Sequence, residues 1–97
     1  MEKRIRLQVL TAEGPAIDEE AVSIIAPGEL GYLGILRNHA PLVTTLIPGM
    51  LKWRGAADAW KTARVGSGLL EVAHNRVTIL TDAVSESPPA SETPHVV

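Results

Sequence analysis

The side chains with the widest chemical repertoire in this sequence are three histidines, at positions 39, 74 and 95. A zinc site needs three or four clustered ligands, but these histidines stand far apart and the chain contains no cysteine. His74 falls in a predicted hairpin turn, and His95 lies close to the C-terminal end. The sequence therefore predicts no metal site and leaves His39, which precedes Ala40-Pro41, as the one histidine in a setting of interest.

Patterns for a nucleophile, a carboxylate pair and a phosphate loop are equally incomplete. Ser67 lies in a Gly-Ser-Gly stretch that lacks the G-x-S-x-G spacing of a hydrolase elbow. The carboxylates of residues 18–20 are adjacent, so along an extended chain they point to opposite faces and do not converge on a substrate. The glycine-bearing segment 28–34 precedes neither a predicted helix nor a Lys-Ser/Thr pair. We predict no catalytic residue and no cofactor, and interpret residues 18–20 as a solvated turn and strand edge.

Composition limits the remaining classes of function. The 97 residues suffice for one domain with one core. The net charge of −2, with scattered Lys and Arg, argues against nucleic-acid binding, which needs a basic surface. No apolar run approaches the ~20 residues that span a bilayer, and residues 1–10 lack the apolar stretch of a signal peptide. We expect a soluble chain from a reducing compartment that can still belong to a membrane-attached assembly.

Elements able to position these residues are predicted to be short strands. Ile5, Leu7 and Val9 alternate with polar residues, as in a strand with one buried face. Gly and Pro interrupt the chain every ~8–12 residues, which is typical of a β-sandwich or barrel. Residues 55–66 also fit two helical turns, but Trp60 and Val65 suit a strand better. We predict an all-β fold with strands over residues 3–11, 21–28, 32–36, 41–47, 50–55 and 60–66, and a hairpin over 68–82.

The predicted turns rest on residues with special backbone freedom. The 68–82 hairpin is expected to turn at His74-Asn75, because Asn tolerates positive φ. An earlier turn is predicted at Gly14-Pro15. We place the end of the folded domain at residue 85, since residues 86–97 are rich in proline and poor in large apolar side chains. We expect those twelve residues to form a disordered tail.

Residues 27–43 allow two interpretations. Three glycines in this segment permit close approach of a partner, and Tyr32 beside leucines suits an interface anchor. Alternatively, the glycines shape turns while Leu33, Ile35 and Leu36 pack inward. The residues by themselves leave both interpretations open.

The ordered motifs in residues 26–54 and 65–84 resemble the epsilon subunit of rotary ATP synthases. The matching stretches are APGELGYLGILRNHAPLVTTLIPGMLKWR and VGSGLLEVAHNRVTILTDAV. The resemblance extends from about Leu7 to Val84 and implies a ten-stranded β-sandwich of two stacked sheets. It also implies a non-catalytic subunit of the central stalk that couples ion flow to ATP synthesis.

The resemblance also implies two contact regions. Residues expected to contact the gamma subunit are His39, Ala40, Pro41, Leu42, Thr44 and Met50. Residues expected to contact the c-ring are Glu29, Gly31, Tyr32, Leu33 and Gly34. The implied location is the cytoplasmic face of the bacterial inner membrane, with the stromal face of the thylakoid as the alternative.

Three departures from the family pattern modify these expectations. Tyr32 stands where members often carry an acid that pairs with basic c-ring loops, which implies a contact by stacking and apolar burial. Arg37-Asn38 replaces the usual Pro-Gly, and we expect the turn to persist because Asn adopts the left-handed conformation. The two-helix hairpin that blocks ATP hydrolysis in most bacterial members is missing before Val97, so we expect no autoinhibition by this chain.

A second hypothesis is a small β-sandwich that binds a ligand or a carbohydrate on an aromatic platform. Only Tyr32, Trp53 and Trp60 are available for one. We expect the two indoles instead to cap the edge of the sandwich, where cross-strand aromatic pairs stabilise a hairpin.

Overall fold

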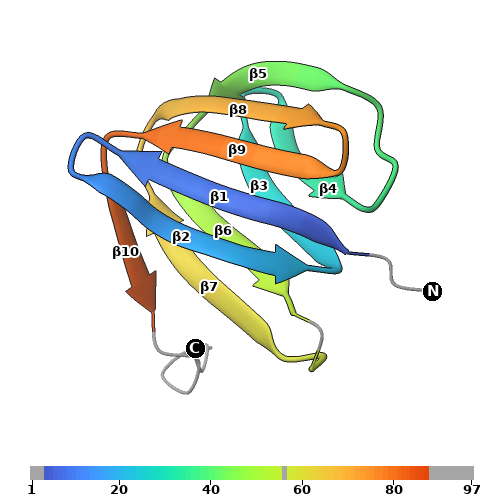
Figure 1. Ribbon diagram of the computed structural model, residues 1–97. Coiled ribbons are helices and arrows are strands. Elements are labelled where there is room, and N and C mark those ends of the chain that lie inside the picture. The colour runs from blue at the N-terminus through green and yellow to red at the C-terminus, as the bar shows by residue number, and fades with distance from the viewer. Residues whose placement is uncertain (1–3, 56, 88–97) are drawn as a thin grey trace, which may run out of the picture.

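The computed structural model describes residues 4–55 and 57–87, and its elements are ten β-strands (Figure 1). They are β1 (Ile5–Thr11), β2 (Gly14–Ala21), β3 (Ser23–Gly28), β4 (Gly31–Ile35), β5 (Leu42–Leu46), β6 (Gly49–Arg54), β7 (Trp60–Val65), β8 (Gly68–Ala73), β9 (Arg76–Thr81) and β10 (Val84–Ser87). The predicted all-β fold is confirmed, including the strand favoured over a helix at β7.

The strands form one hydrogen-bonded path that folds into two layers. Its order is β10-β7-β6-β3-β5-β8-β9-β1-β2, with β4 paired to the remaining edge of β3. The path passes from one layer to the other between β3 and β5, whose pairing is limited to Gly28 opposite Leu46. One layer is therefore β4-β3-β6-β7-β10 and the other is β5-β8-β9-β1-β2, stacked as in a β-sandwich (Figure 1).

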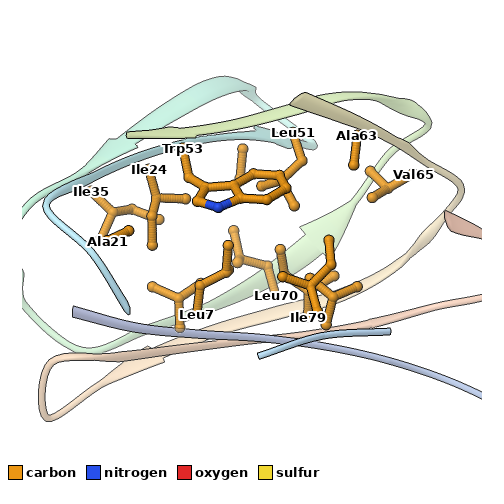
Figure 2. Close-up of a cluster of buried hydrophobic side chains, with 14 of the residues drawn as sticks. Leu7, Ala21, Ile24, Ile35, Leu51, Trp53, Ala63, Val65, Leu70 and Ile79 are labelled. Atoms are coloured by element: carbon orange, nitrogen blue, oxygen red, sulfur yellow. The ribbon is translucent and has the colours of Figure 1, made fainter. Parts of the chain in front are cut away.

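The core lies between these layers and follows the alternation of each strand. Ile5, Leu7 and Val9 of β1 are buried, as their spacing predicts. Figure 2 shows the Trp53 ring from β6 between the layers, with Leu7, Leu70 and Ile79 facing it from the other layer. Trp53 is fully buried, so the expectation that both indoles cap the edge of the sandwich is wrong for this one.

The first strand is held by pairing that spans almost the whole chain. β1 lies between β2, with which it is antiparallel, and β9, with which it is parallel. The parallel pairing sets Leu7 opposite Val77, far along the chain. Two parallel strands are not joined by a tight turn, so no turn sequence marks this pairing. Hydrophobic alternation within each strand also does not reveal which strand lies beside it.

Two predicted boundaries differ from the structure. Residues 18–20 belong to β2, which begins at Gly14, so the turn comes before Gly14-Pro15 and the acidic run is strand rather than turn. The sheet extends to Ser87, because β10 pairs with β7 over Val84–Ser87, two residues beyond the predicted domain end. Residues 88–97, the rest of the predicted disordered tail, lie outside the described residues.

Two of the turn predictions are confirmed by the backbone angles. His74 and Asn75 have φ of 54° and 58°, and Ala73 pairs with Arg76 across them. Two successive positive φ angles are the mark of a type I′ hairpin turn, which matches the twist of the strands. Asn38 has φ of 67°, so it adopts the left-handed conformation expected at that position.

Candidate docking surfaces

The β3–β4 hairpin carries the residues predicted to contact the c-ring. Gly28 pairs with Gly31, so Glu29 and Leu30 form a two-residue turn, and Gly31 has φ of 127°, which glycine adopts without strain. Leu30 at the tip is 97% exposed. The tip thus presents an apolar side chain to solvent, as an interface anchor does.

Tyr32 follows the tip and lies over the start of β6. It is 60% exposed, and its hydroxyl accepts a hydrogen bond from the backbone N–H of Met50 at 3.4 Å. A Cβ added to Gly49 would stand 3.3 Å from that hydroxyl oxygen, so the glycine leaves room for the ring. Met50 was predicted with the gamma-contact residues, but the structure places it beside Tyr32, in the group predicted for the c-ring.

The His39 loop joins β4 to β5 at the opposite end of β4 from the hairpin tip. Asn38 donates its backbone N–H to Oδ1 of Asn75 at 2.5 Å, and Nδ2 of Asn75 donates to Oδ1 of Asn38 at 3.3 Å. These bonds tie the loop to the β8–β9 turn. The backbone N–H of His39 donates to the Leu36 carbonyl at 3.2 Å, and its ring Nδ1, in the protonated tautomer, donates to the Ala40 carbonyl at 2.8 Å.

This geometry gives His39 a local, structural role. The ring is half-buried and bonds to the backbone of the next residue, while Ala40 and Pro41 are exposed. A hydrogen-bonding side chain of similar reach can meet the same requirement. The loop therefore holds an exposed Ala-Pro pair at the entrance to β5.

Strand β5 has two faces, and two of the six predicted gamma-contact residues, Leu42 and Thr44, lie on the inner one. Leu42 pairs opposite Val72 and Thr44 opposite Leu70, and both of those partners are buried. Residues opposite one another share a face of the sheet, so Leu42 and Thr44 point toward the core. The outward residues of this strand are Val43, which is 62% exposed, and Thr45.

An apolar row crosses the outer face of this layer, and sequence reasoning missed it. Thr45, Leu69, Leu80 and Leu10 stand opposite one another on β5, β8, β9 and β1. Leu69 and Leu80 are 44% and 46% exposed. We call Leu10, Val43, Leu69 and Leu80 the outer apolar surface. Its signal in the sequence is a leucine at an outward position, directly beside the buried Leu70 and Ile79, where alternation predicts a polar residue.

The same outer face becomes charged toward the β8–β9 turn. Arg6 donates to the Asp18 carboxylate at 2.7 Å, and Arg4 donates to Glu20 at 2.7 Å. The hydrogen bond from Arg6 holds the pKa of Asp18 below its usual range. These exposed pairs join β2 to β1 and to Arg4 just before it, at the opposite end of β1 from Leu10, so the face combines an apolar half with a charged half. Such a composition is typical of a protein interface with a polar rim.

Other classes of site find little support in the part of the chain that the structure describes. No three His, Asp or Glu side chains of residues 4–55 and 57–87 gather closely enough to hold a metal ion. Nor do these residues form a helix long and apolar enough to cross a membrane. The aromatic platform of the ligand-binding hypothesis is also lost, since Trp53 lies inside the core.

Comparison with known proteins defines the class. The family described as the β-sandwich domain of the ATP synthase delta/epsilon chain matches residues 4–87, a range that includes every residue the structure describes. The ATP synthase epsilon chain of Moorella thermoacetica is 40% identical over 83 residues, and that of Desulfosudis oleivorans is 35% identical over 83. The chain belongs to the ATP synthase delta/epsilon chain family. Each alignment covers 86% of this chain but 62% of the relative, so the chain spans less than two thirds of these relatives.

Solved structures share the fold at low sequence identity. A chain of the Euglena gracilis mitochondrial ATP synthase, in a structure of its OSCP, F1 and c-ring, superposes with a TM-score of 0.81 at 20% identity, covering 89% of this chain and 55% of that one. A chain from the central stalk and c-ring of the Tetrahymena thermophila mitochondrial enzyme gives 0.68 at 17% identity, covering 82% and 64%. These two likenesses establish the sandwich architecture.

Proposed function

We propose that this chain is a non-catalytic rotor subunit of an ion-driven ATP synthase. It joins the gamma subunit to the c-ring and transmits rotation between them. Membership of the epsilon family and the likeness to central-stalk chains support this role. The complex would hold the chain at the membrane surface, on the cytoplasmic face in a bacterium or the stromal face in a plastid.

The gamma subunit docks on the outer apolar surface, and this feature carries the proposal. Leu69 and Leu80 expose apolar area directly opposite one another on β8 and β9, and Val43 of β5 lies diagonal to Leu69, opposite the exposed Glu71. An isolated exposed leucine is ordinary, but a contiguous row flanked by charged pairs favours a protein partner. Pro41, at the end of the His39 loop, extends this surface along β5. The proposed contact therefore has His39, Ala40 and Pro41 at its border. On β5 it uses the outward residues Val43 and Thr45 in place of Leu42 and Thr44.

The c-ring contacts the β3–β4 hairpin through Leu30 and Tyr32. The two side chains are exposed at the tip, beside Gly31 and Gly34, whose small size lets another backbone approach. Glu29 is the one charged residue in the hairpin tip. The proposed contact therefore depends on apolar burial more than on ion pairs.

Co-purification tests the gamma contact. Leu80→Lys places a charge in the middle of the outer apolar surface, where desolvation on docking is costly. We expect the variant to fold and to lose at least about tenfold in affinity for a gamma-subunit/c-ring preparation, which corresponds to about 1.4 kcal/mol. Ser85→Lys, an exposed position on the other layer, is the matched control and should bind normally. Unchanged binding of folded Leu80→Lys would contradict the proposed surface.

A further inference from the structure

Strand β4 has an open edge that lacks the usual protection. In the described chain, β4 pairs with β3 on one side and with no strand on the other. Exposed edges are commonly guarded by charge or proline. The edge strand β2 carries Pro15 and the acidic residues 18–20, and β10 carries Glu86. The sequence of β4 is Gly-Tyr-Leu-Gly-Ile, with neither safeguard.

The backbone groups on this edge follow from the register of the hairpin. Gly28 and Gly31 close a two-residue turn as a hydrogen-bonded pair, and such pairs alternate along an antiparallel ladder. The N–H and C=O groups of Tyr32 and Gly34 therefore point away from β3. Consistently, Pro27, opposite Tyr32, uses its carbonyl on its other side, where it accepts from the N–H of Ile47 at 3.0 Å. The open edge presents two donors and two acceptors in a row.

The side chains along this edge complement a second copy of the same strand. If two β4 strands run antiparallel with Leu33 on the twofold axis, Tyr32 of each lies opposite Gly34 of the other. Gly34 has open space where a Cβ would stand, so the backbone of the facing strand can approach it closely. The Tyr32 ring leans toward β6, where its hydroxyl meets the Met50 N–H, and leaves the open edge uncovered. The same register brings Leu30, 97% exposed, opposite Leu36 of the second copy, 60% exposed.

We infer that β4 pairs with β4 of a second copy of this chain, in this register, to form a symmetric dimer. Two donors and two acceptors from each copy meet across the axis, and the exposed Leu30 and Leu36 find apolar partners. The pairing also covers the hairpin that we propose for the c-ring. This consequence rests on the proposed function: a hairpin that is covered by a second copy cannot contact the c-ring, so self-association and rotor assembly are mutually exclusive.

Sedimentation of the full chain tests the pairing. The interface is short, so we expect weak association: the mass should rise from that of the 10.3 kDa monomer toward that of two copies as concentration approaches about 1 mM. Gly34→Pro removes one donor from the open edge while leaving the bonds to β3 in place, and should remain monomeric. Gly34→Lys, which keeps the backbone donor but sets a charged side chain on the edge strand, should also lower the dimer fraction.

The alternative contact between copies is the outer apolar surface. Leu80→Lys should leave self-association unchanged. If Leu80→Lys abolishes the dimer and Gly34→Pro does not, or if the chain stays monomeric throughout, the inference is wrong. The proposed gamma contact uses Leu80 and the proposed self-association does not. The effect of Leu80→Lys on gamma binding and the effect of Gly34→Pro on the dimer fraction therefore test the two proposals separately.

Cross-linking tests the register, and the absence of cysteine from the sequence makes it clean. Leu33 lies on the proposed axis in a non-hydrogen-bonded pair, where facing Cα atoms are about 4.5 Å apart, within disulfide range. Leu33→Cys should give a disulfide-linked dimer on mild oxidation, and Ser85→Cys should not. A c-ring preparation should lower the yield of the disulfide-linked dimer from Leu33→Cys; equal yields with and without it would contradict the mutual exclusion.

Discussion

Glu19 is the carboxylate that binds the two layers together on the side opposite β4. It belongs to the edge strand β2, and it accepts a hydrogen bond from Nε1 of the buried Trp53 at 3.0 Å and another from Nζ of Lys61 at 3.0 Å. A buried indole needs such a partner for its N–H. Its neighbours Asp18 and Glu20 form exposed ion pairs with arginines, as expected of a solvated edge. One residue of the acidic run is thus structural.

The pKa of Glu19 makes stability depend on pH. Burial raises this pKa, but the hydrogen bonds from Trp53 and Lys61 outweigh burial and leave it below the ordinary 4.5. A lowered pKa means that the stabilisation is present at neutral pH and is lost as the pH falls through the folded-state value. We expect Glu19→Gln to lower the free energy of unfolding at pH 7 by about 1 kcal/mol, a modest value because the pair with Lys61 is half-exposed and screened.

Urea unfolding at several pH values measures this effect. The difference between wild type and Glu19→Gln should shrink as the pH falls below 4.5, where the wild-type carboxylate becomes protonated. Glu20→Gln is the matched control, because its carboxylate pairs at the surface with Arg4 and should contribute little. A difference that stays constant down to low pH would show that the charge of Glu19 is irrelevant.

Two threonines of the sandwich should respond oppositely to loss of their hydroxyls. Among the side chains that the structure describes, Oγ1 of Thr62 is buried without a hydrogen-bond partner. Oγ1 of Thr81, by contrast, donates to the Ser67 carbonyl at 3.1 Å. Denaturant unfolding should show Thr62→Val more stable by about 1 kcal/mol and Thr81→Val less stable by a similar amount, since an unpaired buried hydroxyl is costly and a paired one is not. Destabilisation by both substitutions would mean that Thr62 has a partner in solution.

At the scale of elements, β8 depends on a glycine where three strands meet. Gly68 pairs with Leu46 of β5 and with Thr81 of β9. A Cβ at this position would collide with the backbone carbonyl oxygen of Leu80, which cannot move without disturbing β9. The constraint comes from backbone packed against backbone, so a flexible side chain cannot relieve it.

We therefore expect Gly68→Ala to destabilise the fold by about 3 kcal/mol or more, as substitutions that force a backbone shift do. Gly34→Ala is the matched control: nothing lies within 4 Å of its added Cβ and its φ is not in the left-handed region. It should be neutral or stabilising by up to about 1 kcal/mol, because alanine restricts the unfolded chain. Thermal melts of Gly68→Ala and Gly34→Ala measure this difference. Equal melting temperatures would contradict the close approach of Gly68 to the Leu80 carbonyl.

At the scale of the whole molecule, a single core should unfold in one step. All ten described strands contribute residues to one buried cluster or pack directly against it, and the two layers share Trp53 at their interface (Figure 2). Trp60→Phe leaves Trp53 as the one tryptophan and as a probe of the core. Its fluorescence and the far-ultraviolet circular dichroism should change at the same urea concentration. Separate midpoints would indicate that the layers open independently.

Local patterns predicted much of the architecture because each depends on neighbours in the chain. Alternation in residues 5–9 and 50–54 correctly separates buried from exposed side chains, and His74-Asn75 correctly locates a turn that needs positive φ. β2 was missed because its inward positions include Glu19, which breaks the alternation. The outer apolar surface was missed for the opposite reason, since Leu69 and Leu80 face solvent. Glu19 meets Trp53 of the other layer, and the two leucines belong to the surface that we propose for the gamma subunit.

The amino-acid order was sufficient for the family, for most strand positions and for the turns at Asn38 and His74-Asn75, because strand period and asparagine backbone freedom are properties of a few consecutive residues. Only the tertiary structure shows which distant segments of the chain contact one another. The parallel seating of β1 beside β9, the bond from Trp53 to Glu19 and the open edge of β4 each join or expose segments far apart in the chain. Loop closure between distant segments has no local signature, so the faces on which docking depends emerge only when the layers stack.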